Sequence, residues 1–552
     1  MCDHTRVSFV RIVRPSPQTR QATRRPTDHT VQSDPHSKSN PPAGRWARAR
    51  ARSESEAVRL SVMKAPLIVL LLATSIAASS RVGAARKLAH GVLVRCAKTD
   101  AYADRALHSA FSKSELTNAQ RAQATDIVYG VMRSGSQLDY QLQKLTSPNF
   151  ARKTDLDTLC ALRMGAFELL RNSTPDFAAV NEAVSLAGSR KQQRSFVNGV
   201  LRNLARRREQ GSLPSTSEDA ALSRLEALAI DTSTPLWLLR ELGEPKDGLL
   251  PSFGELSEWA WASQARPDIA IRVNRCKATR ELVEAKLQGA GLSVKRVEGL
   301  SDALLLEAGG GKLSTLPGFA EGEWSVQDVG AQLVALLAVA HASSGCTALD
   351  LCAAPGGKTT HLAELLSENG GRVISVEVHR RKAKLIQESI GRLGLSRAEV
   401  AVADATDADG LLELLASKDV DEGADVVVVD APCSGTGTLR RNPEHRYRAD
   451  DPSKSLKLCE LQASLLDAAA KCVRKGGVVT YSVCSPRRAE TDEAVAKFLE
   501  RNRGFELVGI GDALSPFVAH SDALGGAGTC VRTWTHKHPA DSHFVAQVRR
   551  LC

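Results

Sequence analysis

The chain of 552 residues is too long for one ordinary domain, since domains hold roughly 100–200 residues, and it suggests about three or four of them. Hydrophobic residues make up 43% and charged residues 24%, which excludes wholesale disorder, collagen-like repeats and coiled coils. The twelve cysteines are too sparse for a disulfide scaffold and form no Cys-x-x-Cys pair, which argues against metal ribbons and thioredoxin-type sites. The apolar run from Leu67 to Ala73 is too short to span a bilayer, so we expect a soluble protein without a membrane partner.

The net charge of +11 is unevenly distributed along the chain. Residues 1–85 contain 14 lysines and arginines against 5 acids, residues 86–210 contain 20 against 11, and residues 211–552 contain 39 against 46. A basic segment beside a mildly acidic remainder indicates a separate module for a polyanion, most economically nucleic acid. A solvated helical surface that is basic is the alternative.

Residues 1–85 have the composition of a targeting leader. A Pro-, Ser- and Thr-rich stretch with few acids resembles an organelle transit segment and contains Arg45, Arg48, Arg50 and Arg52. Met63, the apolar run and the small residues 77–79 then have the shape of a secretory signal peptide. Together they predict delivery to a plastid or mitochondrion. An over-extended reading frame, with Met63 as the true start or with no targeting and a cytoplasmic protein, is the alternative.

Residues 86–210 are predicted to form a helical bundle, because apolar residues recur at three- and four-residue spacing and Pro and Gly are scarce. The strings DFAAVNE (176–182) and SFVNGVLR (195–202) resemble the signature helices of NusB-like RNA-binding domains. The arginines that end the second helix are expected to contact RNA phosphates, with a solvated helix end as the alternative. They are Arg202, Arg206, Arg207 and Arg208.

Residues 211–262 are predicted to be a helical connector and residues 263–345 a small α+β lobe with a strand at 269–274. Residues 346–552 alternate strands and helices, which predicts a parallel sheet with helices on both faces. The expected fold is therefore multidomain: an all-α bundle, a small α+β lobe and a Rossmann-like α/β domain.

A Gly-rich turn follows the first strand of the α/β domain, in the string ALDLCAAPGGKT (348–359). Such a turn brings backbone N–H groups close to a ligand at a helix N-terminus. A phosphate-binding P-loop needs glycine at position 352, where Cys352 stands, so an NTPase is excluded. Glu377 and Asp404 follow the next two strands. Alone each would more often be a helix cap, but together they outline a nucleoside pocket.

The strings VVVVDAPCSGTG (426–437) and VVTYSVCSP (478–486) each place a cysteine just beyond a buried strand. A lone cysteine is usually an inert packing residue. Two cysteines at matching strand ends, beside a nucleoside pocket, indicate a nucleophile with a helper.

The strings DLCAAPGGKT, DAPCSGTG and YSVCS resemble the diagnostic motifs of the Sun (Fmu) family of S-adenosylmethionine-dependent RNA cytosine-5 methyltransferases. The strings RVN (272–274), LPGF (316–319) and SVQD (325–328) fit the same family, so the likeness covers residues 86–552. With the NusB-like segment in front, the likeness is to the bacterial-type members that act on small-subunit ribosomal RNA. The resemblance implies S-adenosylmethionine as methyl donor and this RNA as partner.

The resemblance also implies roles for single residues. Cys484 would be the nucleophile, Cys433 would assist product release, and Asp430 would hydrogen-bond the base edge. The cofactor would be held by Cys352, Ala353, Ala354, Pro355, Gly356, Gly357, Lys358, Glu377, Asp404 and Asp430. The arginines after the second string would contact the RNA backbone, with a solvated basic loop as the alternative. They are Arg440, Arg441, Arg446 and Arg448.

Some positions depart from the family pattern without removing a reacting group, so we expect activity. They are Val483, Thr491, Asp492, Glu377 and Ala403, where the family usually shows threonine, asparagine, glutamate, aspartate and glycine. No metal is predicted, since His536, His538 and His543 lack a cysteine or acid partner and are expected at the surface. We expect a monomer. An RNA-binding ribosome-assembly factor on an inactive scaffold, and the same chemistry on tRNA, stay open as alternatives.

Overall fold

The structure is a computed structural model that describes residues 83–99, 101–147, 149–171, 174–246, 248–307, 313–448, 451–510, 512–521 and 524–551. The expected leader lies outside the described residues except for its last three, and its targeting role stays a prediction. The first described helix, α2, begins at Ala84, two residues before the expected start of the helical bundle. Among the described helices, none combines the length and the apolar character that crossing a bilayer requires.

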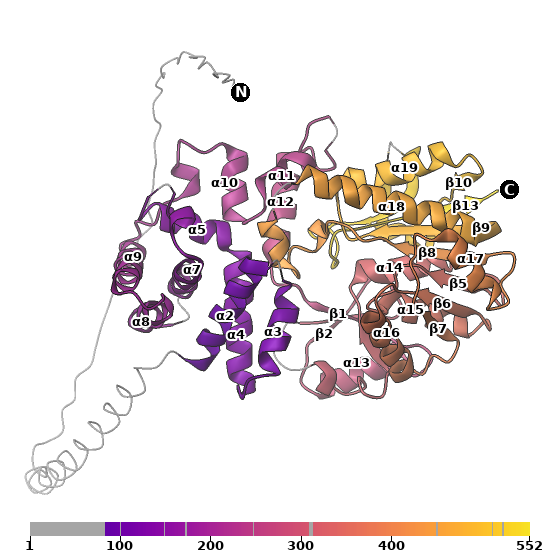
Figure 1. Ribbon diagram of the computed structural model, residues 1–552, viewed down its shortest axis with the longest axis horizontal. Helices are drawn as coiled ribbons and strands as arrows, with labels where there is room; N and C mark the ends of the chain where they lie inside the picture. The colour runs from indigo at the N-terminus through magenta and orange to yellow at the C-terminus, as the bar shows by residue number, and fades with distance from the viewer. Residues whose placement is uncertain are drawn as a thin grey trace, which may run out of the picture. The chain divides into compact units, whose positions relative to one another are not determined.

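Helices alone build the chain between Ala84 and Glu209 (Figure 1). They are α2 (Ala84–Thr99), α3 (Ala103–Phe111), α4 (Asn118–Arg133), α5 (Gly135–Gln143), α6 (Phe150–Lys153), α7 (Leu156–Leu170), α8 (Asp176–Leu186) and α9 (Lys191–Glu209). Their apolar faces enclose one hydrophobic core. Helix α7 lies at its centre, because its side chains are buried almost all round and a helix of that kind needs neighbours on every side. The expected helical bundle is confirmed.

A helical connector follows, with η1 (Thr216–Glu218), α10 (Arg224–Asp231), α11 (Leu236–Leu242) and α12 (Phe253–Gln264). Its apolar residues pack into a core that also takes in Leu439 and Trp534 of the C-terminal domain. Trp259 of α12 is fully buried, and its indole Nε1 donates to Ser542 Oγ at 3.0 Å. The connector is therefore packed against the domain that follows it.

The small lobe is an antiparallel sheet with strand order β2-β3-β1-β4. Its elements are β1 (Ile269–Val273), α13 (Arg280–Gly289), β2 (Val294–Arg296), β3 (Ala303–Leu306), η2 (Leu313–Thr315) and β4 (Trp324–Val326). Strand β1 begins where the sequence places it, and Ile271 pairs with Leu304 in a core closed by Trp324. The expected α+β lobe is confirmed.

The C-terminal domain contains a mixed sheet of order β11-β12-β13-β9-β8-β5-β6-β7, with β10 paired to β13. The strands are β5 (Thr347–Asp350), β6 (Arg372–Val376), β7 (Ala398–Ala401), β8 (Ala424–Asp430), β9 (Val473–Val483), β10 (Phe505–Leu507), β11 (Val518–Ser521), β12 (Gly526–Thr533) and β13 (His543–Arg550). Strands β5 to β9 are parallel, as expected, but β10 to β13 pair antiparallel. The all-parallel expectation is wrong there, because the short links after β11 and β12 hold no crossover helix, and a parallel pair needs one.

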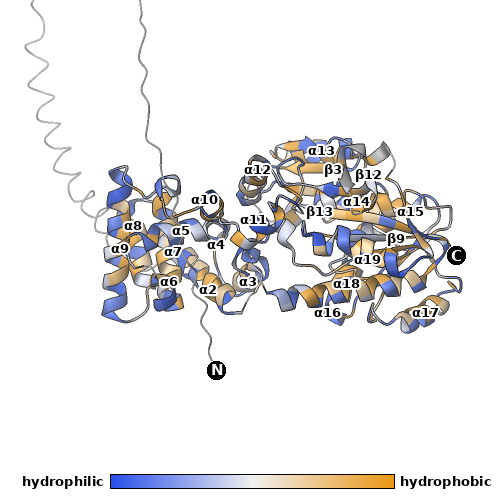
Figure 2. Cartoon of the chain, turned by 90° about the horizontal axis from the view of Figure 1, so that it is seen from above, coloured by the Kyte–Doolittle hydropathy of each residue, from blue (hydrophilic) through white to orange (hydrophobic). Residues whose placement is uncertain are grey.

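Helices cover both faces of this sheet. They are α14 (Val329–Ala338), α15 (Gly357–Ser367), α16 (Arg380–Leu393), α17 (Ala408–Ala416), α18 (Pro452–Cys472) and α19 (Asp492–Arg501). Alternate residues of β8 enter different cores: Val426 and Val428 meet α14 and α15, whereas Val427 and Val429 meet α17 and α18. Figure 2 shows α14 and α18 on opposite sides of the hydrophobic strands. The Rossmann-like three-layer fold is confirmed.

A buried ion pair joins the small lobe to the C-terminal domain. Arg272 of β1 donates from Nε and Nη2 to the two oxygens of Glu364 on α15, at 2.8 and 2.7 Å. The two side chains are 0% and 1% exposed. Arg272 also donates to the Gly357 carbonyl at 3.0 Å, so the pair reaches the first turn of α15.

We predict that Glu364→Ala lowers the free energy of unfolding by about 3–5 kcal/mol, because it leaves the Arg272 guanidinium buried and unpaired. Denaturant unfolding followed by circular dichroism measures this. Replacing both partners, Arg272→Met with Glu364→Leu, should recover most of the loss. The exposed pair of Glu493 and Lys497 on α19 gives the control, since Glu493→Ala should change stability by less than about 1 kcal/mol. Equal effects of the two alanine variants would contradict the role of the buried pair.

Candidate active site

Five parallel strands bring the predicted site residues to one edge of the sheet. The Gly-rich turn follows β5, Glu377 follows β6 and Asp404 follows β7. Asp430 ends β8, and Cys484 follows β9. Because the carboxyl ends of parallel strands meet at one edge, residues spread over the sequence converge there, where open α/β sheets bind ligands.

The Gly-rich turn between β5 and α15 has the backbone that a close ligand approach requires. Gly356 has φ +103°, a left-handed conformation that favours glycine, and a Cβ there would lie 3.2 Å from the side chain of Ile386. Burial raises the pKa of the Cys352 thiol, so this cysteine is an inert wall residue. The turn therefore presents backbone, and not a reactive side chain, to a ligand.

Asp350, the last residue of β5, is buried beneath this turn. Its Oδ2 accepts from Thr359 Oγ1 at 2.7 Å, whereas its Oδ1 has no partner among the described residues. Burial raises the pKa of Asp350 to about 6. A buried acceptor without a donor is costly, so the turn is built to receive a ligand or water there. Sequence reasoning did not single out this carboxylate.

The two acids expected to bind a ribose lie at the same edge. Glu377 Oε1 accepts from the backbone N–H of His379 at 2.9 Å, and its side chain is mostly buried. Asp404 is exposed, and its Oδ1 accepts from Thr406 N at 2.9 Å and from Thr406 Oγ1 at 2.8 Å, which lowers the pKa of Asp404. Both carboxylates act as local caps, and Glu377 also lies next to the Gly-rich turn, because Ala353 N–H donates to the Val376 carbonyl at 3.1 Å. Carboxylates can accept hydrogen bonds from the hydroxyl groups of a ribose. Together with a glycine turn they fit the nucleoside part of S-adenosylmethionine.

Lys358 connects this turn to the second site string. Its Nζ donates to Asp430 Oδ2 at 2.6 Å, while Asp430 Oδ1 accepts from Ser482 Oγ at 2.8 Å. Burial works to lower the pKa of Lys358, but the Asp430 carboxylate more than offsets it and the pKa is raised. Lys358 therefore carries its positive charge between the cofactor turn and the cysteines.

The two predicted cysteines are in contact. Cys433 Sγ and Cys484 Sγ lie 3.4 Å apart, at the ends of the neighbouring strands β8 and β9. The hydrogen bond with Cys484, together with burial, raises the pKa of Cys433 well above its usual range. At rest Cys433 is therefore a protonated thiol that can donate to Cys484.

Glu490 holds the two cysteine segments together, and sequence reasoning missed it. Its carboxylate accepts from Ser434 N at 2.8 Å and from Ser434 Oγ at 2.6 Å. It also accepts from Ser485 Oγ. Ser434 and Ser485 directly follow Cys433 and Cys484, so one buried carboxylate fixes both. The repeated Cys-Ser pair, with an acid shortly after it, was the available signal.

The side chains of His536 and His543 are buried and His538 is half-buried, so the expectation of surface histidines is wrong for His536 and His543. His543 opens β13 and is buried; burial, and then the Lys358 charge, lower its pKa to about 4. Its ring is neutral near pH 7, and its Nε2 has no partner among the described residues. The side chain of His536 is also buried, and burial lowers the pKa of His538. No group of three or more His, Cys, Asp or Glu residues suited to a metal ion occurs in the described part of the chain.

Arg440, Arg441 and Arg446 form their hydrogen bonds inside the protein, so their expected role at the RNA backbone is wrong, whereas that of Arg448 stays a prediction. Arg440 Nε and Arg441 Nε both donate to the buried carboxylate of Asp541, and Arg441 Nη2 donates to Asp328 at 2.8 Å. Arg446 is buried and donates to the carbonyls of Thr232, Ser233 and Ser263. Arg448 stacks over Tyr102, with its guanidinium carbon 5.5 Å from the ring centre.

These contacts arise because residues 436–448, which we call the bridging segment, lie between the catalytic domain and the helical bundle. The segment contains η3 (Thr436–Thr438) and η4 (Pro443–Tyr447). Tyr447 Oη donates to the Met132 carbonyl at 3.0 Å. A Cβ on Gly135 would lie only 2.0 Å from Tyr447 Oη and would overlap it. The segment that follows Cys433 is thus seated on the bundle.

The arginines of α9 divide into two groups. Arg202 and Arg206 are exposed and bond only to neighbouring asparagines of their own helix, Asn198 and Asn203, so they stay candidates for RNA contact. Arg208 instead forms an ion pair with Asp176 at 2.8 Å, which corrects its expected phosphate contact.

Comparison with known proteins shows which families the parts of the chain resemble. Residues 337–549 match the family described as 16S rRNA methyltransferase RsmB/F, residues 83–206 match the NusB family, and residues 250–311 match the RsmF/B-like ferredoxin-like domain. A Bacillus subtilis (strain 168) protein named "Probable ribosomal RNA small subunit methyltransferase B" is 35% identical over 76% of this chain and 89% of its own length. Ribosomal RNA small subunit methyltransferase B of Citrobacter koseri is 31% identical over 74% of this chain and 88% of its own.

Among solved structures, the crystal structure of PH0851 covers 84% of this chain and 99% of that one, with a TM-score of 0.68 and 25% identity. The matches thus extend over the helical bundle, the small lobe and the sheet that bears the two cysteines. The chain belongs to the RsmB/F (Sun) family of S-adenosylmethionine-dependent rRNA methyltransferases, with an N-terminal NusB domain.

Proposed function

We propose that the enzyme methylates C5 of a cytosine in small-subunit rRNA through a covalent bond between Cys484 and C6 of the base. The observation that carries this proposal is the pair of thiols 3.4 Å apart beside Asp430, at the edge of the sheet that carries the cofactor turn. A nitrogen or oxygen atom that receives a methyl group already has a lone pair to attack it, so such a reaction needs no nucleophile from the protein. A carbon acceptor in an electron-poor ring does need one, and a thiol both attacks and leaves readily.

The chemistry assigns a step to each thiol. The Cys484 thiolate forms a bond to C6, which makes C5 enamine-like and nucleophilic. Bound S-adenosylmethionine supplies an electrophilic methyl group. C5 takes this methyl carbon while its bond to the sulfonium sulfur breaks and leaves the electron pair on sulfur. Removal of the C5 proton then restores the C5–C6 double bond, and the electron pair of the S–C6 bond returns to Cys484.

Cys433 is suited to remove that proton at the right time. Its hydrogen bond with Cys484 is the largest cause that raises its pKa. Once Cys484 is bonded to C6, its sulfur is part of a thioether, a weak hydrogen-bond acceptor, so this cause is weakened. Cys433 then loses its proton to solvent water more readily, and its thiolate takes the C5 proton, which releases the product.

Asp430 and Lys358 hold the base and its charge. One oxygen of Asp430 is fixed by Ser482 and the other by Lys358, so the carboxylate is pre-oriented. It faces the base as an acceptor for the cytosine amino group, and the buried Lys358 ammonium stabilises negative charge at the site. The target base leaves its stack to enter, which loops of RNA permit at low cost.

We also propose that residues 1–85 deliver the enzyme to a plastid or mitochondrion, where bacterial-type ribosomes contain its substrate. Their basic composition and the bacterial relatives support this. A fusion of residues 1–85 to a fluorescent protein should co-localise with an organelle in cells of the source organism. A second fusion that starts at Met63 tests whether residues 63–85 are sufficient for delivery. Diffuse cytoplasmic fluorescence from both fusions would contradict a targeting role for residues 1–85.

We predict that Cys433→Ala accumulates a covalent protein–RNA adduct, because methylation proceeds and release stalls. Cys484→Ala should form neither adduct nor methylated product. Labelled S-adenosylmethionine with small-subunit rRNA, followed by denaturing electrophoresis, separates these outcomes. Methyl transfer by Cys484→Ala at the wild-type rate would exclude the covalent mechanism. A tRNA substrate is run alongside, and methylation of tRNA alone would overturn the rRNA target.

We predict that Glu490→Gln lowers kcat by about 10- to 100-fold with little change in KM, because a small misplacement of a reacting group is costly. Glutamine keeps the size but replaces one acceptor oxygen with a donor, so the Ser434 N–H and the hydroxyls of Ser434 and Ser485 cannot all donate to it. Single-turnover methyl transfer at saturating RNA measures the effect. Glu493→Gln, an exposed neighbour on α19, is the control. A Glu490→Gln enzyme with unchanged kcat would show that the two segments hold their positions without the carboxylate.

A further inference from the structure

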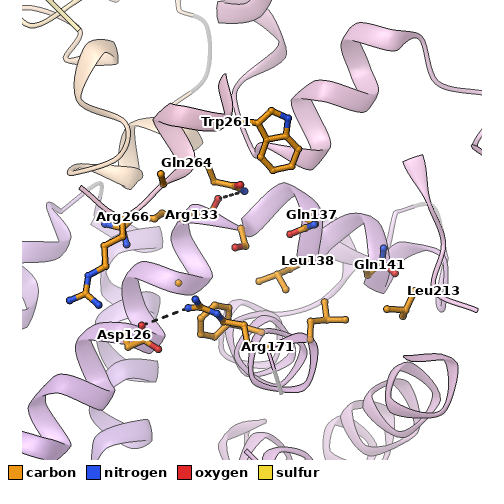
Figure 3. A pocket seen from close by; sticks show the side chains of 15 residues that line it. Asp126, Arg133, Gln137, Leu138, Gln141, Arg171, Leu213, Trp261, Gln264 and Arg266 are labelled. Carbon is orange, nitrogen blue, oxygen red and sulfur yellow. Dashed lines mark hydrogen bonds and ion pairs between the residues drawn. The ribbon is translucent and has the colours of Figure 1, made fainter. Parts of the chain in front are cut away.

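A cleft of about 670 Å³ opens where the helical bundle meets the connector (Figure 3). Its walls come from α4, α5, α7 and α12 and from the residues that lead into β1. Pockets of roughly 300–1,000 Å³ are the size that holds small ligands. None of the site residues discussed above lines this cleft, so it is a separate feature of the molecule.

The cleft is positively charged. Arg133, Arg171 and Arg266 line it, with Asp126 as its single acid. Asp126 lies 3.7 Å from Arg171, while Arg266 is exposed. The pKa of Arg133 is lowered to about 10, chiefly by burial, and the charges of Arg266 and Arg171 contribute to this. An anion in the cleft would be attracted by these guanidinium groups.

An exposed aromatic ring stands at the rim of the cleft. Trp261 and Trp259 both belong to α12, but Trp259 is 0% exposed in the core and Trp261 is 49% exposed and lines the cleft. In Figure 3 the Trp261 indole lies above Gln137 and Leu138. A large flat ring beside arginines is the arrangement on which unpaired RNA bases stack.

The inner wall carries an unused polar atom. Gln141 of α5 is 8% exposed, and its Nε2 donates to the Pro214 carbonyl at 2.8 Å. Its Oε1 has no partner among the described residues. An unpaired acceptor in a buried wall is costly, and a ligand N–H, such as the exocyclic amine of a base, would satisfy it. Phe167 and Leu138 provide apolar surface around it.

We propose that this cleft binds one unstacked nucleotide of the rRNA substrate, with its base on Trp261 and its phosphate between Arg266 and Arg171. The proposal rests on the RNA substrate of the proposed function, not on the identity of the methylated atom. Arg133, in the cleft wall, donates to the Arg440 carbonyl at 2.8 Å, so the cleft contacts the bridging segment behind Cys433. The nucleotide bound in this cleft is therefore a different one from the methylated nucleotide, and it helps to hold the RNA on the enzyme.

The full chain and a fluorescently labelled small-subunit rRNA fragment test this by anisotropy across a range of salt concentrations. Trp261→Ala should weaken RNA binding about ten-fold without changing the salt dependence, because one base stack is lost. Trp261→Phe should bind within about three-fold of wild type, since the ring still stacks. Arg266→Ala should weaken binding and lower the slope of log K against log salt by about one.

Matched surface variants give the controls. Leu282→Ala on α13 removes an apolar side chain of nearly the same exposure, 47%, and Lys295→Ala removes an exposed cation, both away from the cleft. Both should bind RNA as wild type does. Thermal unfolding shows whether Trp261→Ala is folded. A folded Trp261→Ala with the affinity of Leu282→Ala would overturn the proposal, as would a Trp261→Phe as weak as Trp261→Ala.

The methylation assay separates this proposal from the previous one. Cys484→Ala should bind RNA with wild-type affinity and the same dependence on Trp261, while it transfers no methyl group. If wild type fails to methylate C5 but binding still depends on Trp261, the proposed function fails and the cleft stands. If wild type methylates C5 and the Trp261 and Arg266 variants bind RNA as wild type does, the cleft proposal fails and the proposed function stands.

Discussion

A single buried guanidinium constrains how the catalytic module is assembled. Arg272 is fully buried, so every one of its bonds must be made inside the protein. Its partners are Glu364, Thr360 and the Gly357 carbonyl, all in α15, and Gln327 just before α14. Because Gly357 begins the helix after the cofactor turn, the small lobe cannot shift without exposing or unpairing this charge. The lobe thereby fixes the turn from behind, although it contributes no reacting group.

The bridging segment extends this constraint from the Gly-rich turn to the two cysteines. Its first half is tied to the catalytic domain, because Arg440 and Arg441 share the buried Asp541. Its second half is tied to the bundle and connector through Arg446 and Tyr447. The segment begins only three residues after Cys433. Buried contacts therefore connect the NusB domain to the loop beside the two cysteines.

The fold and the reacting pair were predictable because their signals are local. A buried strand followed by a small-residue turn fixes where a side chain emerges, and this was enough to bring Cys433 and Cys484 together from 51 positions apart. The fates of Arg446 and His543 were not predictable. Arg446 is buried because its guanidinium donates to carbonyls of residues 183 to 214 positions earlier in the chain, and no local pattern indicates such partners. Glu490 was missed for the same reason, since its ligand Ser434 lies 56 positions before it.

The distribution of charge now has a structural explanation. Residues 86–210 carry the excess of lysine and arginine, and the structure leaves Arg202, Arg206 and Arg171 of this part exposed. The arginines near the cysteines, by contrast, donate their hydrogen bonds to Asp541, Asp328 and backbone carbonyls inside the protein. The exposed arginines of the bundle therefore offer electrostatic attraction for RNA at a distance from the two cysteines. Binding energy gained at such a distance accelerates a reaction only if a rigid connection converts it into orientation at the reacting atoms. The contact of Arg133 with Arg440 is one such connection.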